Sequence, residues 1–142
     1  MTESLTWADA ELLNIDYLRT ELVAYATAHA GSVAAGVRVM NKPPAGEQVP
    51  TPLVTCRRVG GTAAQMFDHP RIQVRAWHAS EQQAEGLMNL VRDLLRLMPG
   101  EHGGFHVTRV AEFIGPTAVP DPDSQTPQRM MTVEETIKAT RR

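Results

Sequence analysis

Residues 70–83, PRIQVRAWHASEQQ, change from the two-residue period of a strand to the longer period of a helix. Side chains of a strand point alternately to opposite faces, so residues 71–78 should present two unlike faces. The two sets are Ile72, Val74 and Ala76 on one face, and Gln73, Arg75 and Trp77 on the other. The apolar set predicts a face that packs on a core. The charged and aromatic set is either solvated or in contact with another molecule.

The helix that follows has the clearest pattern in the chain. Ser80 and Gln83 have the spacing of a capping box, in which side chains satisfy backbone N–H groups of the first turn. One face of this predicted helix is apolar and consists of Ala84, Leu87, Met88, Val91, Leu94, Leu95 and Met98. Gly86 indicates a close approach to the sheet, and the pair Pro99-Gly100 ends the helix.

The rest of the chain predicts one more helix and several strands. Apolar residues at helical spacing predict a helix within residues 6–29, with a break near Asn14. Runs bounded by turn residues predict four further strands, at 34–40, 53–59, 104–114 and 128–138. Three segments are expected to lack regular structure: a proline-rich loop at 41–52, an extended loop at 115–128 and a basic tail at 139–142.

These elements favour an α+β fold in a single domain, residues 1–142. The chain of 142 residues is long enough to bury roughly two-thirds of its unfolded surface in one core. Strands outnumber helices and do not alternate regularly with them. We therefore expect a mixed, mainly antiparallel sheet of about four to five strands, packed on one face by two helices.

Composition and charge exclude several classes of protein. The net charge of −2 argues against a general nucleic-acid binder. The single cysteine, Cys56, excludes an internal disulfide framework and a multi-cysteine zinc site, and its apolar surroundings predict a core residue. The polar, acidic start is unlike a signal peptide, and no stretch reaches the ~18–20 apolar residues of a membrane span. We expect a soluble protein without membrane contact, made in a cytoplasm.

The charges are unevenly spread, because residues 1–30 are mostly acidic and residues 57–75 mostly basic. The acidic end and the basic middle either pair within one subunit or between copies, or both are simply solvated.

The sequence shows no arrangement that predicts catalysis or a bound ion. No phosphate-binding glycine loop, nucleophile elbow or zinc-protease motif is present. Glu134 and Glu135 are adjacent on a predicted strand and point to opposite faces, which is wrong for a paired-carboxylate site. Asp121 and Asp123 flank Pro122, a pattern more typical of turns than of a cation site. We therefore expect a protein that is not an enzyme and has no metal or cofactor.

The second face of the predicted sheet is the most informative surface. It should carry Arg57 and Val59 from one strand, Arg75 and Trp77 from the next, and Met130 from the last. Tryptophan, arginine and methionine are enriched where proteins contact proteins. The alternative is an antiparallel sheet with one solvated face, which is common. The pattern favours a protein interface over that alternative.

Three motifs, in this order along the chain, resemble those of a known protein family. They are RRVGG at 57–61, VRAWHASEQQA at 74–84 and GPTAVPDPDSQTPQR at 115–129. In this combination, and over about residues 5–138, the chain resembles the tail terminator proteins (tail completion or head–tail joining proteins) of long-tailed bacteriophages, especially those of actinobacterial hosts. The resemblance implies a sheet flanked by helices and a structural role.

The resemblance also implies partners. A ring of identical subunits, typically a hexamer, would cap the tail tube, end its polymerisation and join the tail to the head. The implied partners are other copies of the chain, the tail tube protein and a head-completion or connector protein, and genomic DNA would pass through the lumen without sequence-specific binding. The chain would be assembled in the host cytoplasm and would reside in the virion.

The interface candidates on this basis are Arg57, Arg58, Arg75, Trp77, Asp121, Asp123 and Arg129. Two alternatives remain open: another head–tail connector or tail tube component, and a small RNA-binding domain that uses the arginine-bearing strand and Trp77.

Overall fold

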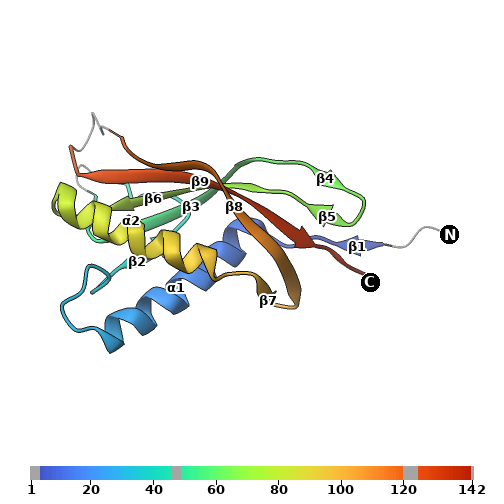
Figure 1. The fold of residues 1–142 in the computed structure, drawn as a ribbon, viewed down its shortest axis with the longest axis horizontal. Helices are drawn as coiled ribbons and strands as arrows, with labels where there is room; N and C mark the ends of the chain where they lie inside the picture. Colours follow the sequence, from blue (N-terminus) through green and yellow to red (C-terminus); the bar gives the residue numbers. More distant parts are fainter. Residues whose placement is uncertain (1–3, 46–48, 120–124, 142) are drawn as a thin grey trace.

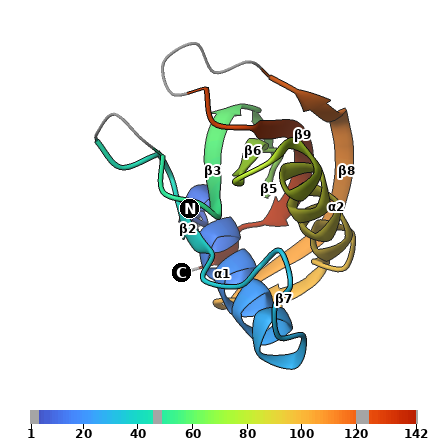
Figure 2. The same ribbon diagram turned by 90° about the vertical axis from the view of Figure 1, so that its left-hand side faces the viewer.

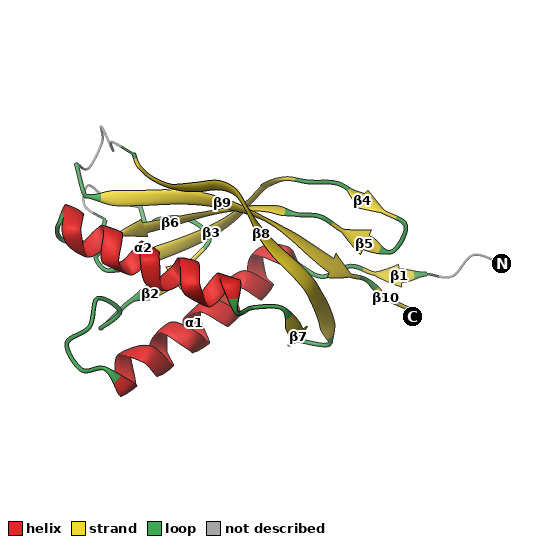
Figure 3. Ribbon diagram, viewed as in Figure 1, coloured by secondary structure: helices red, strands yellow, loops and turns green. Residues whose placement is uncertain are grey.

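The computed structural model describes residues 4–45, 49–119 and 125–141. It contains two helices, α1 (Ala10–Ala28) and α2 (Glu81–Arg96), and ten strands (Figures 1 and 3). The strands are β1 (Leu5–Thr6), β2 (Arg38–Met40), β3 (Leu53–Gly60), β4 (Ala63–Ala64), β5 (Phe67–Asp68), β6 (Arg71–Trp77), β7 (Gly100–His102), β8 (Phe105–Ala118), β9 (Gln128–Lys138) and β10 (Thr140–Arg141).

Eight of these strands form one curled sheet around the long strand β9 (Figure 2). On one side β9 pairs with β6 and then with β5, and on the other side it pairs with β8. Strand β3 pairs with β6, and β2 is parallel to β3, whereas the other pairs are antiparallel. Strands β1 and β10 form a separate two-stranded ribbon. The mixed α+β fold is confirmed, but the predicted four to five strands are too few.

Both helices cover the same face of the sheet (Figure 1). The buried side chains of that face include Val54 and Cys56 on β3, Ile72 and Val74 on β6, and Met131, Val133 and Ile137 on β9. They share one core with Ile15, Leu18 and Leu22 of α1 and with Leu87, Met88 and Val91 of α2. The predicted core face of the strand at 71–78 and the core position of Cys56 are therefore confirmed.

The start of α2 follows its sequence signals closely. Ser80 is the N-cap, and its Oγ accepts a hydrogen bond from the Gln83 backbone N–H at 3.2 Å and donates one to Gln83 Oε1 at 3.1 Å. Gly86 was expected to mark a close approach of this helix to the sheet, and that expectation is wrong. A Cβ at this position would lie 3.3 Å from Cγ1 of Val33, so the close approach is to the turn after α1 and not to the sheet.

Four boundaries differ from the predictions. Helix α1 runs through Asn14 without a break, and the strand expected at 34–40 spans only Arg38–Met40. Strand β8 continues to Ala118, so the extended loop predicted at 115–128 begins later. Thr140 and Arg141 pair with β1, so the predicted basic tail is partly a strand. The physical reason in each case is a partner distant in sequence, which a local pattern does not contain.

Asn14 joins α1 to the middle of the sheet by a buried polar contact. Its Nδ2 donates hydrogen bonds of 2.8 Å to Ala10 O and to Glu135 Oε1 on β9. Asn14 and Glu135 are both fully buried. Burial raises the pKa of Glu135 to about 7, and the hydrogen bond from Asn14 partly opposes this increase. Burial also raises the pKa of the neighbouring Cys56 thiol, and the Glu135 carboxylate adds to that increase.

Glu135 lies on the core face of β9, whereas Glu134 lies on the opposite face and pairs with Arg71. The predicted opposite orientation of the two carboxylates is confirmed. One Glu135 oxygen, Oε2, and the Asn14 Oδ1 have no hydrogen-bond partner within the described part of the chain. A neutral carboxylic acid is a donor as well as an acceptor, so the protonated form suits this buried position better than the charged form.

Glu135→Gln should therefore change how stability depends on pH. The folded-state pKa of about 7 lies above the ordinary value of 4.5, so the native state keeps a proton that the unfolded chain loses. This group then lowers the free energy of unfolding by roughly 3 kcal/mol as pH rises from about 4.5 to about 7, and by no more above that. Urea unfolding at pH 5, 6, 7 and 8 measures the slope.

We expect the Glu135→Gln protein to lose this fall in stability and to be more stable than the wild type at pH 8. Glu134→Gln, on the exposed side of the same strand, is the matched control and should keep the wild-type slope. An unchanged slope in Glu135→Gln would contradict the assignment.

Candidate subunit interface

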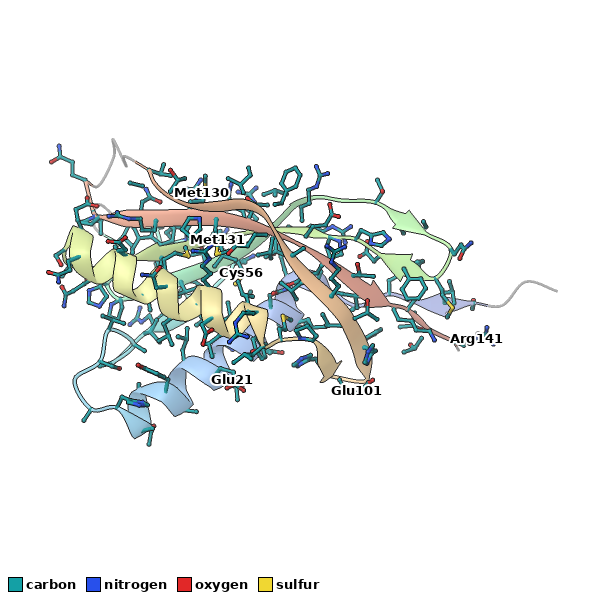
Figure 4. All side chains as sticks on the ribbon, viewed as in Figure 1. Glu21, Cys56, Glu101, Met130, Met131 and Arg141 are labelled. Atoms are coloured by element: carbon teal, nitrogen blue, oxygen red, sulfur yellow. The ribbon has the colours of Figure 1, made fainter. Side chains whose placement is uncertain are left out.

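The face of the sheet turned away from the helices carries arginine and apolar side chains together. Residues paired directly across antiparallel strands point to the same face. Arg57 pairs with Gln73, which pairs with Thr132, and Thr55 pairs with Arg75, which pairs with Met130. Figure 4 shows Met130 on the side of β9 opposite Met131, which points to the helices. We call this side the outer face, and define it by Arg57, Arg71, Gln73, Arg75, Phe113, Ile114 and Met130.

Arg57 and Arg75, two of the predicted interface residues, are on the outer face. Arg57 is exposed, and Arg75 is half-buried with its Nε donating a hydrogen bond of 3.2 Å to Gln73 Oε1. Arg71 on the same face forms an ion pair of 3.1 Å with Glu134, and its guanidinium carbon lies 4.1 Å from the centre of the Phe113 ring. A cation over an aromatic ring is favourable, so Arg71 and Phe113 hold one another in place.

Two large apolar side chains are exposed on this face, Phe113 (50% exposed) and Ile114 (48% exposed). Val59 is 47% exposed and lies at the register shift between Arg58 and Gly60, where strand alternation does not assign its face. Single exposed apolar residues are normal on a protein surface. Two of them beside three arginines on one sheet are the composition of a contact surface.

The prediction that Trp77 is exposed on this face is wrong. Trp77 is only 2% exposed, and it lies in a cross-strand row with Leu53 and Gln128, which are also buried. Trp77 is the last residue of β6, where β3 and β9 begin, and both of its cross-strand neighbours are buried, so this row of the sheet is covered although alternation places it on the outer side. Arg75, one row earlier, lies between Thr55 and Met130 and reaches the surface.

Arg58 and Arg129 form ion pairs within the chain. The Arg58 guanidinium donates two hydrogen bonds to the Asp68 carboxylate, of 2.7 and 2.8 Å. Its backbone N–H donates one of 3.0 Å to Glu11 of α1. Arg129 forms an ion pair with Glu81 in the first turn of α2, and its side chain is 15% exposed. Both arginines therefore connect elements of one subunit. Asp121 and Asp123 lie outside the described residues.

The Arg58–Asp68 pair anchors a small hairpin made by β4 and β5, which extends one end of the sheet where β5 pairs with β9 (Figure 1). The chain turns tightly at Gly61, where a Cβ would lie 2.0 Å from the backbone oxygen of His69. The backbone N–H of Ala139 donates a hydrogen bond of 2.8 Å to Met66 O and ties the hairpin to the end of β9. The close contact at Gly61 explains why a Gly60-Gly61 pair ends the strand predicted at 53–59, because only glycine fits this turn.

A groove on the helix side is the second candidate surface. It lies between α1 and the turn that joins β7 to β8, and it measures about 450 Å³. Its apolar lining includes Leu12, Leu13 and Phe105, and three carboxylates, Asp9, Asp16 and Glu21, lie along it. We call it the α1 groove. The Tyr17 hydroxyl donates a hydrogen bond to Leu94 O, and burial together with Glu21 and Asp93 raises the pKa of Tyr17 to about 12. Tyr17 is thus a neutral, fixed part of the lining.

Sequence reasoning placed Arg57, Gln73, Arg75 and Met130 on the outer face, but missed Arg71, Phe113 and Ile114 and the residues that line the α1 groove. The alternation that placed Gln73 and Arg75 also places Arg71 on the outer face, so that signal was present. Phe113 and Ile114 gave no such signal, because the pairing of β8 with β9 shifts register between Val107 and Arg109, between Glu112 and Ile114, and between Ile114 and Thr117. Each shift resets which side chains share a face.

Arg57→Ala and Arg58→Ala should distinguish the exposed arginine of the outer face, Arg57, from the arginine that anchors the hairpin, Arg58. Arg58→Ala leaves the buried Asp68 carboxylate without its bidentate partner, and we expect it to lower the free energy of unfolding by about 1–3 kcal/mol. Arg57→Ala removes an exposed side chain and should change this free energy by less than about 0.5 kcal/mol. Equilibrium unfolding in urea compares the two neighbours directly. Equal losses in both variants would contradict the assignment of Arg58 to the hairpin anchor.

The described residues contain no group of three or more His, Cys, Asp or Glu side chains that could hold a metal ion. None of the helices in the described ranges is long and apolar enough to cross a membrane.

Comparisons with known proteins give a similar solved structure and a matching protein family. A chain in a solved structure described as "Virion of native gene transfer agent (GTA) particle" has a similar fold, with a TM-score of 0.55 and 14% sequence identity over 92% of this chain and 99% of that chain. No curated protein sequence matches the chain. The model of one protein family, described as "Phage tail termination protein", matches residues 7–134. Because this match spans most of the sequence, the chain belongs to the phage tail termination protein family.

Proposed function

We propose that the chain forms a ring of identical copies, a hexamer, which caps the finished tail tube of a long-tailed phage, ends its polymerisation and joins the tail to the head. The observation that carries this proposal is the family match over residues 7–134, which include both helices and every strand of the large sheet except the last residues of β9. The role is structural and requires no catalysis.

The surfaces of the chain support self-assembly into a ring. A ring needs two different patches on each copy, so that one patch contacts the other patch on the next copy. The outer face and the α1 groove lie on opposite layers of the molecule, and each combines exposed apolar side chains with charges of one predominant sign. A chain with two such unlike surfaces is suited to contacts that repeat head to tail.

The remaining partners follow from the same proposal. One side of the ring would bind the tail tube protein and the other a head-completion or connector protein, with DNA passing through the lumen without sequence-specific contacts. The virion would belong to a phage of an actinobacterial host. A head–tail connector or a tube component is the alternative within the same class, and tube assembly distinguishes them.

The RNA-binding alternative is less well supported by the exposed side chains. Single-stranded RNA is commonly held by bases stacked on exposed aromatic rings. Trp77, the predicted platform, is buried, and Arg71 covers one face of the exposed Phe113. The exposed arginines fit a protein contact without such stacking.

Purified protein added to polymerising tail tube protein of the same phage should limit tube length. We expect tubes to stop growing once one end is capped, with a ring visible at that end by electron microscopy, and mean length should fall as the ratio of terminator to tube protein rises. Native mass measurement of the protein alone and with tubes gives the number of copies in the ring.

A tube component would instead be incorporated along the length of the tube, and a connector would leave tube length unchanged. Either result would contradict the capping role. Tube protein incubated with the same concentration of an unrelated protein controls for crowding.

A further inference from the structure

We propose that the α1 groove of each copy receives the outer face of the next copy. This contact rests on the ring proposed above and specifies how its subunits meet. The occupant of both surfaces is thus a second copy of the chain.

Helix α1 differs from α2 in what it leaves exposed. On α1, Leu12 is 52% exposed and Val23 is 53% exposed, and both lie on the solvent side of the helix. On α2, by contrast, every exposed residue from Glu81 to Arg96 is polar or charged. A helix that packs on a core with one face is normally polar on the other. The apolar residues on the second face of α1 therefore indicate that this face is also covered.

The charges of the two surfaces are complementary. The α1 groove contains Asp9, Asp16 and Glu21, and no lysine or arginine is among its lining residues, although Asp16 forms an exposed ion pair of 3.8 Å with Arg19 one turn along the helix. On the outer face, the Arg71 charge is balanced by Glu134, which leaves Arg57 and Arg75 as positive groups without an acidic partner on that face among the described residues. Glu21 and Met130 project from opposite sides of the molecule (Figure 4), so one copy does not satisfy both surfaces by itself.

Like-with-like contacts are disfavoured by the same charges. Two α1 grooves in a two-fold contact would bring six carboxylates together, and two outer faces would bring arginines together. Opposed like charges select against a partner as effectively as attractive contacts select for one. The combination that remains is groove to outer face, which is the unlike pairing that a ring requires. Apolar residues on both sides, such as Leu12 and Phe113, then meet as well.

Two charge-reversal variants test this contact. The groove variant is Asp16→Arg with Glu21→Arg, and the outer-face variant is Arg57→Glu with Arg75→Glu. In each variant alone, both surfaces carry the same sign, and we expect the fraction of protein in rings to fall at least tenfold. Sedimentation and electron microscopy, alone and at tube ends, measure this fraction.

Mixing the two variants in equal amounts should restore rings. In an alternating ring, the basic groove of one variant meets the acidic outer face of the other, and the acidic groove of the second meets the basic outer face of the first. A single chain with all four substitutions should also form rings, because both of its surfaces are reversed. Glu85→Arg with Arg96→Glu, at exposed positions of α2, is the control and should assemble as the wild type does.

Two sets of results would overturn the contact, and they are distinguishable. Rings in the wild type with no rescue by mixing or by the fourfold variant would remove this contact and leave the ring standing. If the outer-face variant also loses binding to double-stranded DNA without rescue, the arginines face the genome instead. A wild-type protein that forms no ring, alone or on tube ends, would overturn the proposed function and this contact together.

Discussion

Strand β9 lies at the centre of the sheet, and the alternation of its side chains sets the two faces of the molecule. Met131, Val133 and Ile137 point to the helices and are buried, whereas Met130 and Glu134 point away. Strands β6, β5 and β8 all pair with β9, and residues paired across these strands lie on the same face. The division into two faces therefore extends from β9 to its neighbours. A shift of one residue along β9 would expose its core residues and bury Met130 and Glu134, so the division into two faces depends on the register of this strand.

Helix α1 has a role on both of its sides. Towards the sheet, Asn14 forms a buried hydrogen bond with Glu135, and Leu18 and Leu22 fill the core. Towards solvent, Leu12 lines the acidic groove and is exposed, and Val23 is exposed further along the helix. A helix with apolar residues on both sides has little amphipathic pattern. The sequence therefore predicted a helix here, with a break near Asn14 that the structure does not have, but did not indicate which of its faces is free. Helix α2 is strongly amphipathic by contrast, because its exposed residues are all polar or charged.

Sequence patterns predicted those parts of the fold that are determined by residues close together in the chain. The two-residue period of residues 71–77 and the Ser80 cap are decided by neighbouring residues, and both are confirmed. Arg58 and Arg129 gave no signal of their structural roles, because their partners Asp68 and Glu81 are set by the tertiary fold. Trp77 followed the strand alternation, but it is buried together with Leu53 and Gln128, its neighbours on β3 and β9, and alternation alone does not show which rows of a face are covered. Strands of two or three residues, such as β4 and β10, are too short to show any period.

In the proposed ring, the outer face and the α1 groove are buried against one another between neighbouring copies. A cryo-electron microscopy reconstruction of the tail end of the virion would show this contact. We expect a closed ring in which Arg57 and Arg75 of each copy lie within hydrogen-bonding distance of acidic residues on α1 of the next. A ring in which those arginines face the lumen or solvent, with α1 uncovered, would contradict it.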